Sequence, residues 1–361
     1  MPARTLSITD HRHDPVAWAT SLGISREAVD LYLDSDVIDL HNDLYVPARL
    51  YGYDVHRRHR PWLFGFRFTG QTDLPRLREA RLTGICLDIA TNPARPGNNR
   101  SAVAHRNIER VRRDLGEHPE HFRFVRTMRE YRAARLDGLT ACFIGIQGGQ
   151  AFQHDRKSLE DLPEALVHRV TLVHLTNSRI GSTSSPLGPD RGGLTSRGCE
   201  LVEVLNQKRI LVDLAHINRA GFLHAADVHD RTQPLICTHT GVNGVYRHWR
   251  NLDDDQIRLV ADTGGVVGIM FHGLFLDGSQ WRHCPPERVL DHMEHVIEVA
   301  GEKAVAIGTD WDGMVIPPQG LEEPGRLPRL VQLMLDRKWS EARIRGALGT
   351  NALRTFEFIA P

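Results

Sequence analysis

Eight short apolar segments recur along the chain, and helical stretches lie between them. Several are continuously apolar, as expected for parallel strands that are buried on both faces of a sheet. Eight such β-then-α units favour a closed (β/α)8 barrel of the TIM type over an open, doubly wound sheet. The segments are 37–40, 83–89, 141–146, 170–175, 210–214, 235–238, 266–271 and 304–308.

The length of 361 residues fits one barrel of this kind, because such barrels form a single domain at this size. The sequence has no Pro- or Ser-rich linker that would divide it. It also lacks the G-x-G-x-x-G turn or Walker A loop that a nucleotide-binding open sheet would need. We therefore expect one α/β barrel domain over residues 1–361, with an N-terminal extension at 1–24.

Helix signals agree with this interpretation. Asp253 followed by Gln256 has capping-box spacing and predicts a helix over 254–262. Ser25 predicts another helix before the first strand, and Ser340 predicts a final helix from 341 to about 358. Amphipathic stretches at 197–207 and 286–300 predict two more, and a long loop is expected at 273–285.

The overall charge gives no reason to expect a nucleic-acid or membrane partner. Lys and Arg together number 45, as do Asp and Glu, so the formal net charge is zero. No apolar segment approaches the ~20 residues needed to cross a bilayer, and the polar N-terminus lacks the core of a signal peptide. Five scattered cysteines without C-x-x-C spacing are typical of reduced thiols, so we expect a cytoplasmic protein.

Imidazole and carboxylate side chains stand where predicted strands end. His41 and Asp43 follow the first apolar segment, and His216, His239 and Asp310 follow the fifth, sixth and eighth. Each histidine alone is more often a satisfied buried residue than a ligand. Their joint position at strand ends favours a site for a divalent metal such as Zn²⁺ at the mouth of the barrel. The sequence has no G-x-S-x-G elbow and no H-E-x-x-H motif to suggest another scheme.

Seven segments, taken in order, resemble the membrane (renal) dipeptidase family of the amidohydrolase superfamily. The resemblance extends from about residue 37 to residue 358. The segments are 38–43, 70–77, 171–174 with Asn177, 212–216, 250–252 leading into 264–267, 308–313 and 351–356.

This resemblance implies a metal-dependent hydrolase for a dipeptide or dipeptide-like metabolite. His41 and Asp43 would hold one zinc ion, and His216 and His239 the second. It also suggests a small peptidic or amino-acid-derived substrate and a homodimer.

The resemblance implies roles for three further residues. Asp310, beside the metal, would shuttle the proton. His174 would stabilise the tetrahedral oxyanion. Arg250 would clamp the terminal carboxylate of the substrate, a role that suits its planar guanidinium.

Gln147 departs from the family pattern, because a Glu-Gly-Gly segment there supplies a glutamate that bridges two metals. An amide is neutral and has one good ligating oxygen, so it does not offset the repulsion between two close cations. We therefore predict one tightly bound zinc at most. The segment around Cys86 lacks the aromatic residues of the family, and His272 stands where a substrate-contacting tyrosine is expected. Alternatives are a non-hydrolytic, metal-assisted reaction such as a tautomerisation, or an impaired homologue that binds such a ligand.

Overall fold

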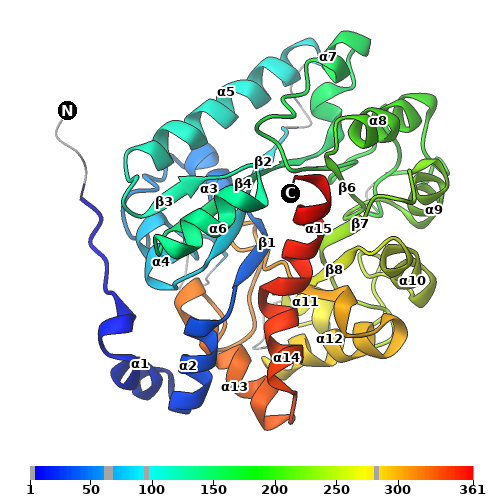
Figure 1. The fold of residues 1–361 in the computed structure, drawn as a ribbon. Helices are drawn as coiled ribbons and strands as arrows, with labels where there is room; N and C mark the ends of the chain where they lie inside the picture. Colours follow the sequence, from blue (N-terminus) through cyan, green and yellow to red (C-terminus); the bar gives the residue numbers. More distant parts are fainter. Residues whose placement is uncertain (1–4, 61–67, 93–96, 187, 280–283, 361) are drawn as a thin grey trace.

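The computed structural model describes residues 5–60, 68–92, 97–186, 188–279 and 284–360. Its nine strands are parallel and follow the order β2-β1-β9-β8-β7-β6-β5-β4-β3. A further pairing of β2 with β4 closes eight of them into a barrel, with helices around it (Figure 1). The strands are β1 (Ile38–Asn42), β2 (Gly84–Ala90), β3 (Phe122–Phe124), β4 (Thr140–Gln147), β5 (Arg169–Thr171), β6 (Leu211–Asp213), β7 (Leu235–Thr240), β8 (Val266–Ile269) and β9 (Val305–Ile307).

Helices α3 to α12 lie between successive strands, because parallel strands need crossover connections, whereas α1 and α2 precede β1 and α13 to α15 follow β9. They are α1 (Pro15–Leu22), α2 (Arg26–Asp34), α3 (Tyr45–Leu50), α4 (Leu74–Glu79), α5 (Gly97–Gly116), α6 (Met128–Leu136), α7 (Arg156–Glu160), α8 (Ser196–Gln207), α9 (Arg219–Val228), α10 (Asp254–Asp262), α11 (Gly273–Leu276), α12 (Glu287–Ala300), α13 (Pro328–Asp336), α14 (Glu341–Arg345) and α15 (Asn351–Ile359). Short helices η1 (His11–His13), η2 (Gly149–Phe152), η3 (Glu302–Ala304), η4 (Pro324–Arg326) and η5 (Gly346–Thr350) complete the set, of which η5 is a π-helix.

The helix α15 closes the amino end of the barrel. In Figure 1 this helix lies in front of the strands, and its Phe356 packs against Phe143 of β4, with ring centroids 4.6 Å apart. Both belong to an apolar cluster that includes Ile38 and Val266, which lie at the starts of their strands. A second cluster fills the space between the strands and the surrounding helices. Polar side chains are therefore accommodated at the opposite, carboxyl ends of the strands, where barrel chemistry gathers.

The predicted barrel is confirmed, and each predicted apolar segment overlaps a strand of the closed sheet. Ser25 and Asp253 cap α2 and α10 as predicted, the latter with a full capping box. The final helix predicted from 341 to about 358 is present as α14 and α15, with the five-residue π-helix η5 between them. The expected loop at 273–285 begins with α11, and residues 280–283 lie outside the described residues.

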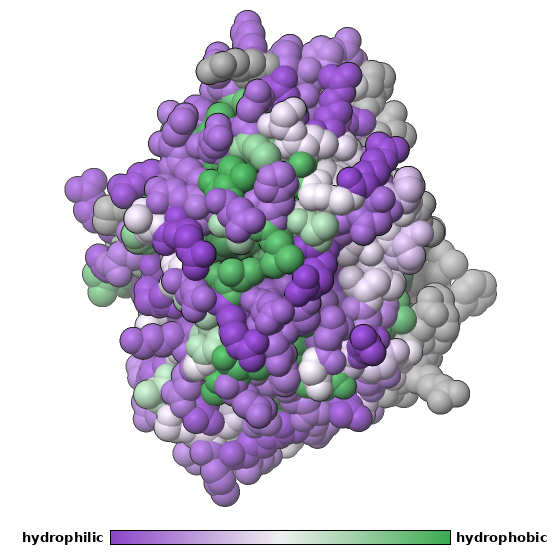
Figure 2. Space-filling view, turned by 90° about the vertical axis from the view of Figure 1, so that its right-hand side faces the viewer, coloured by the Kyte–Doolittle hydropathy of each residue, from purple (hydrophilic) through white to green (hydrophobic). Residues whose placement is uncertain are grey.

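The outer face of the helix layer is mostly polar. Figure 2 shows the side where α8, α9 and α10 lie, and its hydrophobic residues gather only in small groups. Among the described residues, none of the helices combines the length and apolar content that crossing a membrane requires.

Candidate active site

Two bulges place histidines at the mouth of the barrel. Along β1, Asp39 pairs with Ile85 and Asn42 pairs with Leu87, so β1 has one residue more than β2 between these pairs. The same extra residue occurs in β7, between Cys237 and Thr240. A bulge interrupts side-chain alternation and re-aims its neighbours. His41 and His239 lie within these two irregular segments.

Left-handed backbone places two more side chains. His216 has φ +67° and Asp310 has φ +62°, conformations that few residues other than glycine adopt. Each follows the end of a short strand, β6 or β9. Backbone of this kind costs of order 1–3 kcal/mol per residue and clusters at functional sites. The structure thus places these two side chains at a cost in stability.

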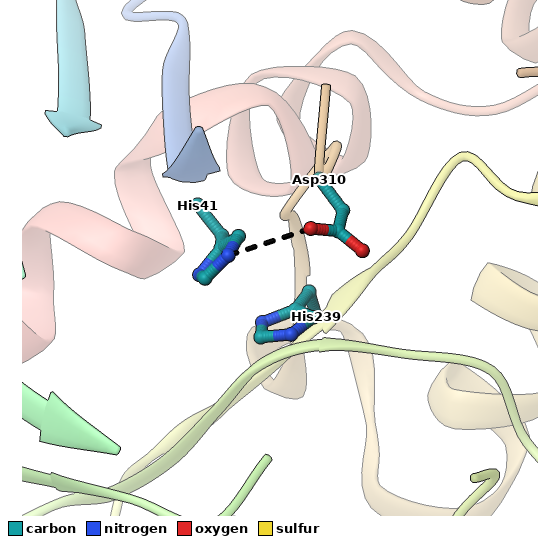
Figure 3. Close-up of side chains that lie close together, drawn as sticks. All are labelled: His41, His239 and Asp310. Carbon is teal, nitrogen blue, oxygen red and sulfur yellow. Dashed lines mark ion pairs between the residues drawn. The ribbon is translucent and has the colours of Figure 1, made fainter. Parts of the chain in front are cut away.

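His41, His239 and Asp310 form the centre of the site (Figure 3). One ligand atom from each lies within 4.8 Å of the others, and all three side chains are buried. The His41 and His239 ring centroids are 3.7 Å apart, and Nε2 of His41 lies 3.4 Å from Oδ1 of Asp310. His216 completes the cluster, because its Nε2 lies 2.8 Å from Nε2 of His239.

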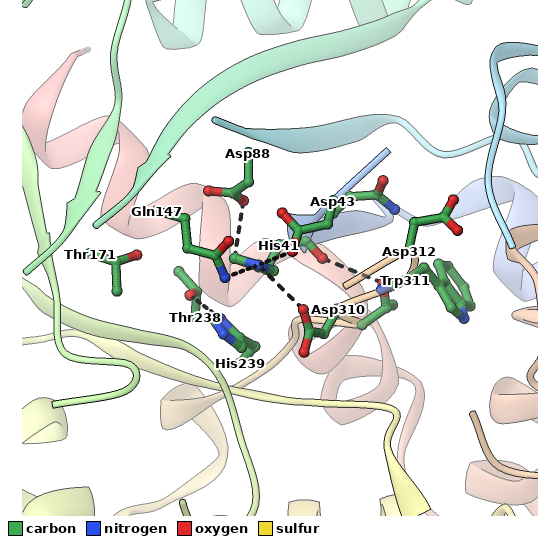
Figure 4. A network of polar contacts seen from close by, with 12 residues as sticks. His41, Asp43, Asp88, Gln147, Thr171, Thr238, His239, Asp310, Trp311 and Asp312 are labelled. Atoms are coloured by element: carbon green, nitrogen blue, oxygen red, sulfur yellow. Dashed lines mark hydrogen bonds and ion pairs between the residues drawn. The ribbon is translucent and has the colours of Figure 1, made fainter. Parts of the chain in front are cut away.

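Two further polar side chains face His41 (Figure 4). Oδ2 of Asp43 lies 3.7 Å from Nε2 of His41, although Asp43 follows the end of β1 rather than lying within the strand. Nε2 of Gln147, the last residue of β4, lies 3.1 Å from the same nitrogen. Oδ1 of Asp43 and Oε1 of Gln147 are buried without a hydrogen-bond partner among the described residues. These orphaned oxygens and the clustered imidazoles fit the donor set of a borderline divalent cation.

Burial sets the protonation of the cluster. It lowers the pKa of His41, His216 and His239 well below the usual value, and the nearby Arg250 guanidinium acts in the same direction. The three imidazoles are therefore neutral at pH 7, as a metal ligand must be. Burial, together with the neighbouring Asp43, raises the pKa of Asp310 well above the usual value. Asp310 therefore holds a proton more readily than an ordinary carboxyl group does.

The buried guanidinium group of Arg169 lies beside the histidine cluster. Arg169, the first residue of β5, contacts Asp88 of β2 through Nη2, and its Nη1 donates to Oδ2 of Asp213 at 3.0 Å. The same Nη2 lies 2.7 Å from Nδ1 of His41, which is also 3.0 Å from Oδ2 of Asp88. Figure 4 shows Asp88 beside His41, on the opposite side from Asp310.

Asp213 fixes the strand ends around this cation. Its Oδ2 accepts hydrogen bonds from the hydroxyls of Thr171 and Thr238, at 2.6 and 2.8 Å. Burial opposes ionisation here, but Arg169 and these hydroxyls together hold the pKa of Asp213 below its usual value. The Thr238 hydroxyl lies 2.8 Å from Nδ1 of His239, so the same network orients a central imidazole.

Arg250 lies beside the centre and is almost fully buried. Its Nη2 donates to the carbonyl oxygen of His239 at 2.7 Å, and its Nε has no partner among the described residues. A cavity of about 140 Å³ is lined by both Arg250 and His216. One cavity therefore contacts both His216, a predicted metal ligand, and Arg250, which was predicted to bind the terminal carboxylate of the substrate.

The two other predicted substrate contacts occupy different places. His174 lies beyond the end of β5 and is partly buried, with its ring centroid 4.7 Å from that of His216. Burial lowers the pKa of His174 to about 4. His272 accepts a hydrogen bond at Nδ1 from the amide of Ile316 and packs on Phe275. No contact within the described residues joins His272 to the central histidines.

Asp88 and Arg169 belong to the site but were not predicted from the sequence. A signal was present, because each is a charged residue within or at the edge of an otherwise apolar strand. Charged groups are almost never fully buried unless they are paired. The two partners are separated by 81 positions, so the sequence alone did not show that they meet.

Comparison with known families identifies the chain. A family model described as membrane dipeptidase, peptidase family M19, matches residues 25–360. The chain belongs to the membrane dipeptidase family. Membership places it among metallo-dipeptidase-like hydrolases, which are metal-dependent.

Solved structures agree with this membership. A dipeptidase of family M19 shares 28% identity, with a TM-score of 0.78 over 90% of this chain and 98% of that one. A metallopeptidase from Rhodobacter sphaeroides, solved with a phosphinate mimic of L-Ala-D-Ala, shares 26% identity, with a TM-score of 0.79 over 90% and 100%. An amidohydrolase from Pseudomonas aeruginosa, at 21% identity, has a TM-score of 0.75 over 92% and 98% and shows the fold alone.

Proposed function

We propose that this member of the membrane dipeptidase family hydrolyses the amide bond of a dipeptide or dipeptide-like metabolite. The convergence of His41, His239 and Asp310, with ligand atoms within 4.8 Å of one another, carries the proposal. Together with His216, Asp43 and the oxygen of Gln147, these residues would hold zinc. A bound zinc ion supplies Lewis-acid chemistry and lowers the pKa of water.

The chain's own residues would orient the substrate and move its protons. Arg250 would bind the terminal carboxylate through its free Nε, in the cavity that it shares with His216. His174 would contact the carbonyl oxygen as negative charge develops there. Asp310 would take a proton from the attacking water and return it to the leaving amine, as its raised pKa allows.

The neutral side chain of Gln147 favours binding of one zinc ion rather than two. Its amide lies 3.1 Å from Nε2 of His41 and brings no negative charge. The nearby carboxylates of Asp88 and Asp213 are already paired with the buried guanidinium of Arg169, so they leave little negative charge to offset a second metal ion. Two cations there would be opposed by electrostatic repulsion that no bridging carboxylate offsets.

Metal analysis and a dipeptide panel test the proposal. After dialysis against zinc, we expect at most one tightly bound ion per chain and slow hydrolysis of simple dipeptides, which a chelator abolishes. Two full-occupancy ions with rapid turnover would show that the amide is tolerated as a bridge. Metal binding without hydrolysis of any dipeptide would favour the second candidate, a non-hydrolytic reaction on a peptidic metabolite, which the altered bridging position supports.

A further inference from the structure

A second, larger cleft opens beside the mouth of the barrel. Its volume is about 680 Å³, against about 140 Å³ for the cavity at Arg250. Its lining residues come from the segment after β4, the segment after His174, the loop with Arg191 that leads into α8, the first turn of α8, and Arg100 of α5. Thr176, in one wall, is two residues from His174. One wall of the cleft therefore begins two residues after His174 in the sequence.

The cleft is cationic. Its described lining residues include four arginines and no aspartate or glutamate. Arg197 forms an ion pair with Glu200 at 2.5 Å. Within the part of the chain that the structure describes, no ion pair involves Arg179 or Arg191. A hollow lined in this way attracts an anion.

The N-terminus of α8 contributes to the same cleft. Thr195 caps this twelve-residue helix, and Thr195, Ser196 and Arg197 all line the cleft. The first amide groups of a helix lack acceptors within the helix, and the helix dipole favours negative charge beside them.

Gln150 provides an independent indication of a ligand. This cleft-lining residue is 2% exposed, and neither Nε2 nor Oε1 has a partner among the described residues. A buried amide without hydrogen bonds costs roughly 1–3 kcal/mol, so such a group usually serves a partner. Its side chain folds over Gly148, which has φ +109° and leaves no room there for a Cβ atom. Gly148 follows Gln147, so the orphaned amide lies beside the end of the strand that carries Gln147.

We propose that this cleft binds a carboxylate on the side chain of the substrate, so that the preferred substrate is an acidic dipeptide-like amide. The proposal rests on the proposed function and names its substrate class. Arg179 and Arg191 would supply the charge, and the Gln150 amide would donate to the carboxylate. Arg250 would remain free for the terminal carboxylate.

Calorimetric binding separates this proposal from the question of turnover. The probes are Ala-Glu and Glu-Ala, each paired with its neutral glutamine isostere, and the proteins are wild type and Arg179→Gln/Arg191→Gln. We expect wild type to bind at least one glutamyl dipeptide about tenfold more tightly than its isostere, since each charge-assisted contact is stronger than a neutral one. The double variant should lose most of this preference and bind the glutamine dipeptides unchanged. Arg258→Gln, on the exposed face of α10, is the matched control.

Two results would overturn the proposal. Equal affinities for the glutamyl and glutaminyl dipeptides, or no detectable binding of either, would show that the cleft does not recognise a carboxylate. A phosphoserine dipeptide that binds tightly while Ala-Glu and Ala-Gln remain equal would assign the cleft to a phosphorylated substrate instead. Gln150→Leu should reduce the preference for the glutamyl dipeptide, because it removes the amide donor but no charge. Failure of the proposed function would appear separately, as absence of turnover in the presence of binding.

Discussion

Nη2 of Arg169 lies 2.7 Å from Nδ1 of His41, and the carboxylate of Asp88 contacts both groups. Arginine can only donate, so its hydrogen bond to Nδ1 puts the proton of the neutral imidazole on Nε2. If Nδ1 instead donates to Asp88, the lone pair of Nε2 faces the centre. These two arrangements exclude one another, and only the second lets His41 bind a metal through Nε2.

Removing the Arg169 charge should destabilise the barrel. We expect Arg169→Met to lower the free energy of unfolding by about 3–5 kcal/mol, because Asp88 and Asp213 would remain buried without their cation. Urea titration measures this change. Arg258→Met, which breaks only exposed ion pairs, should cost about 1 kcal/mol or less. A loss of similar size in both variants would show that the buried pairs contribute no more than surface ones.

Restoring a carboxylate at Gln147 should change the metal content. We expect Gln147→Glu to raise zinc stoichiometry toward two and to increase hydrolysis of simple dipeptides, by about tenfold or more if water activation is limiting. Metal analysis after matched dialysis, with a dipeptide panel, checks both effects. Gln207→Glu is the control, because it adds the same charge at an exposed position at the end of α8, outside the histidine cluster. No gain for Gln147→Glu would mean that the other departures from the family pattern, around Cys86 and at His272, already commit the site to another reaction.

Replacing the guanidinium group of Arg250 with an ammonium group should weaken substrate binding. Arg250→Lys keeps the charge but loses the planar, two-pronged guanidinium, so we expect KM for dipeptides to rise about tenfold with a smaller change in kcat. Steady-state kinetics on a carboxylate-terminated dipeptide and its amidated form give the comparison. The amidated substrate should be affected less. An unchanged KM for every hydrolysed substrate would remove Arg250 from the binding site.

Burial of His168 should make the folded protein less stable in acid. Burial lowers its pKa to about 3, whereas an unfolded histidine titrates near 6.5. Between these values the unfolded chain binds a proton that folded His168 does not. The contribution of neutral His168 to the free energy of unfolding is therefore complete above pH 6.5 and is lost as the pH falls toward 3. His168→Phe, between Phe143 and Phe356, should reduce the slope of unfolding free energy against pH by up to about 1.4 kcal/mol per pH unit in this range. His13→Phe, at an exposed site, should leave the slope unchanged.

The sequence by itself determined the barrel and the residue types at its mouth. Continuous apolar segments alternating with helical stretches are compatible with few other folds, and a local pattern is enough to show them. His41, His216, His239 and Asp310 could be placed at strand ends for the same reason. The π-helix at 346–350 within the final helix was not predicted, since it depends on packing against β9 and β1.

Only the tertiary structure decided which atoms meet. The bulges in β1 and β7 depend on pairing with neighbouring strands, and the left-handed backbone of His216 and Asp310 is held by its surroundings. The contact of Arg169 with His41 spans 128 positions. Such contacts follow from closure of the barrel, which brings β1, β2 and β5 around one axis, and no local propensity encodes them. The cleft at Gln150 has the same origin, because its walls come from separate strand-to-helix connections.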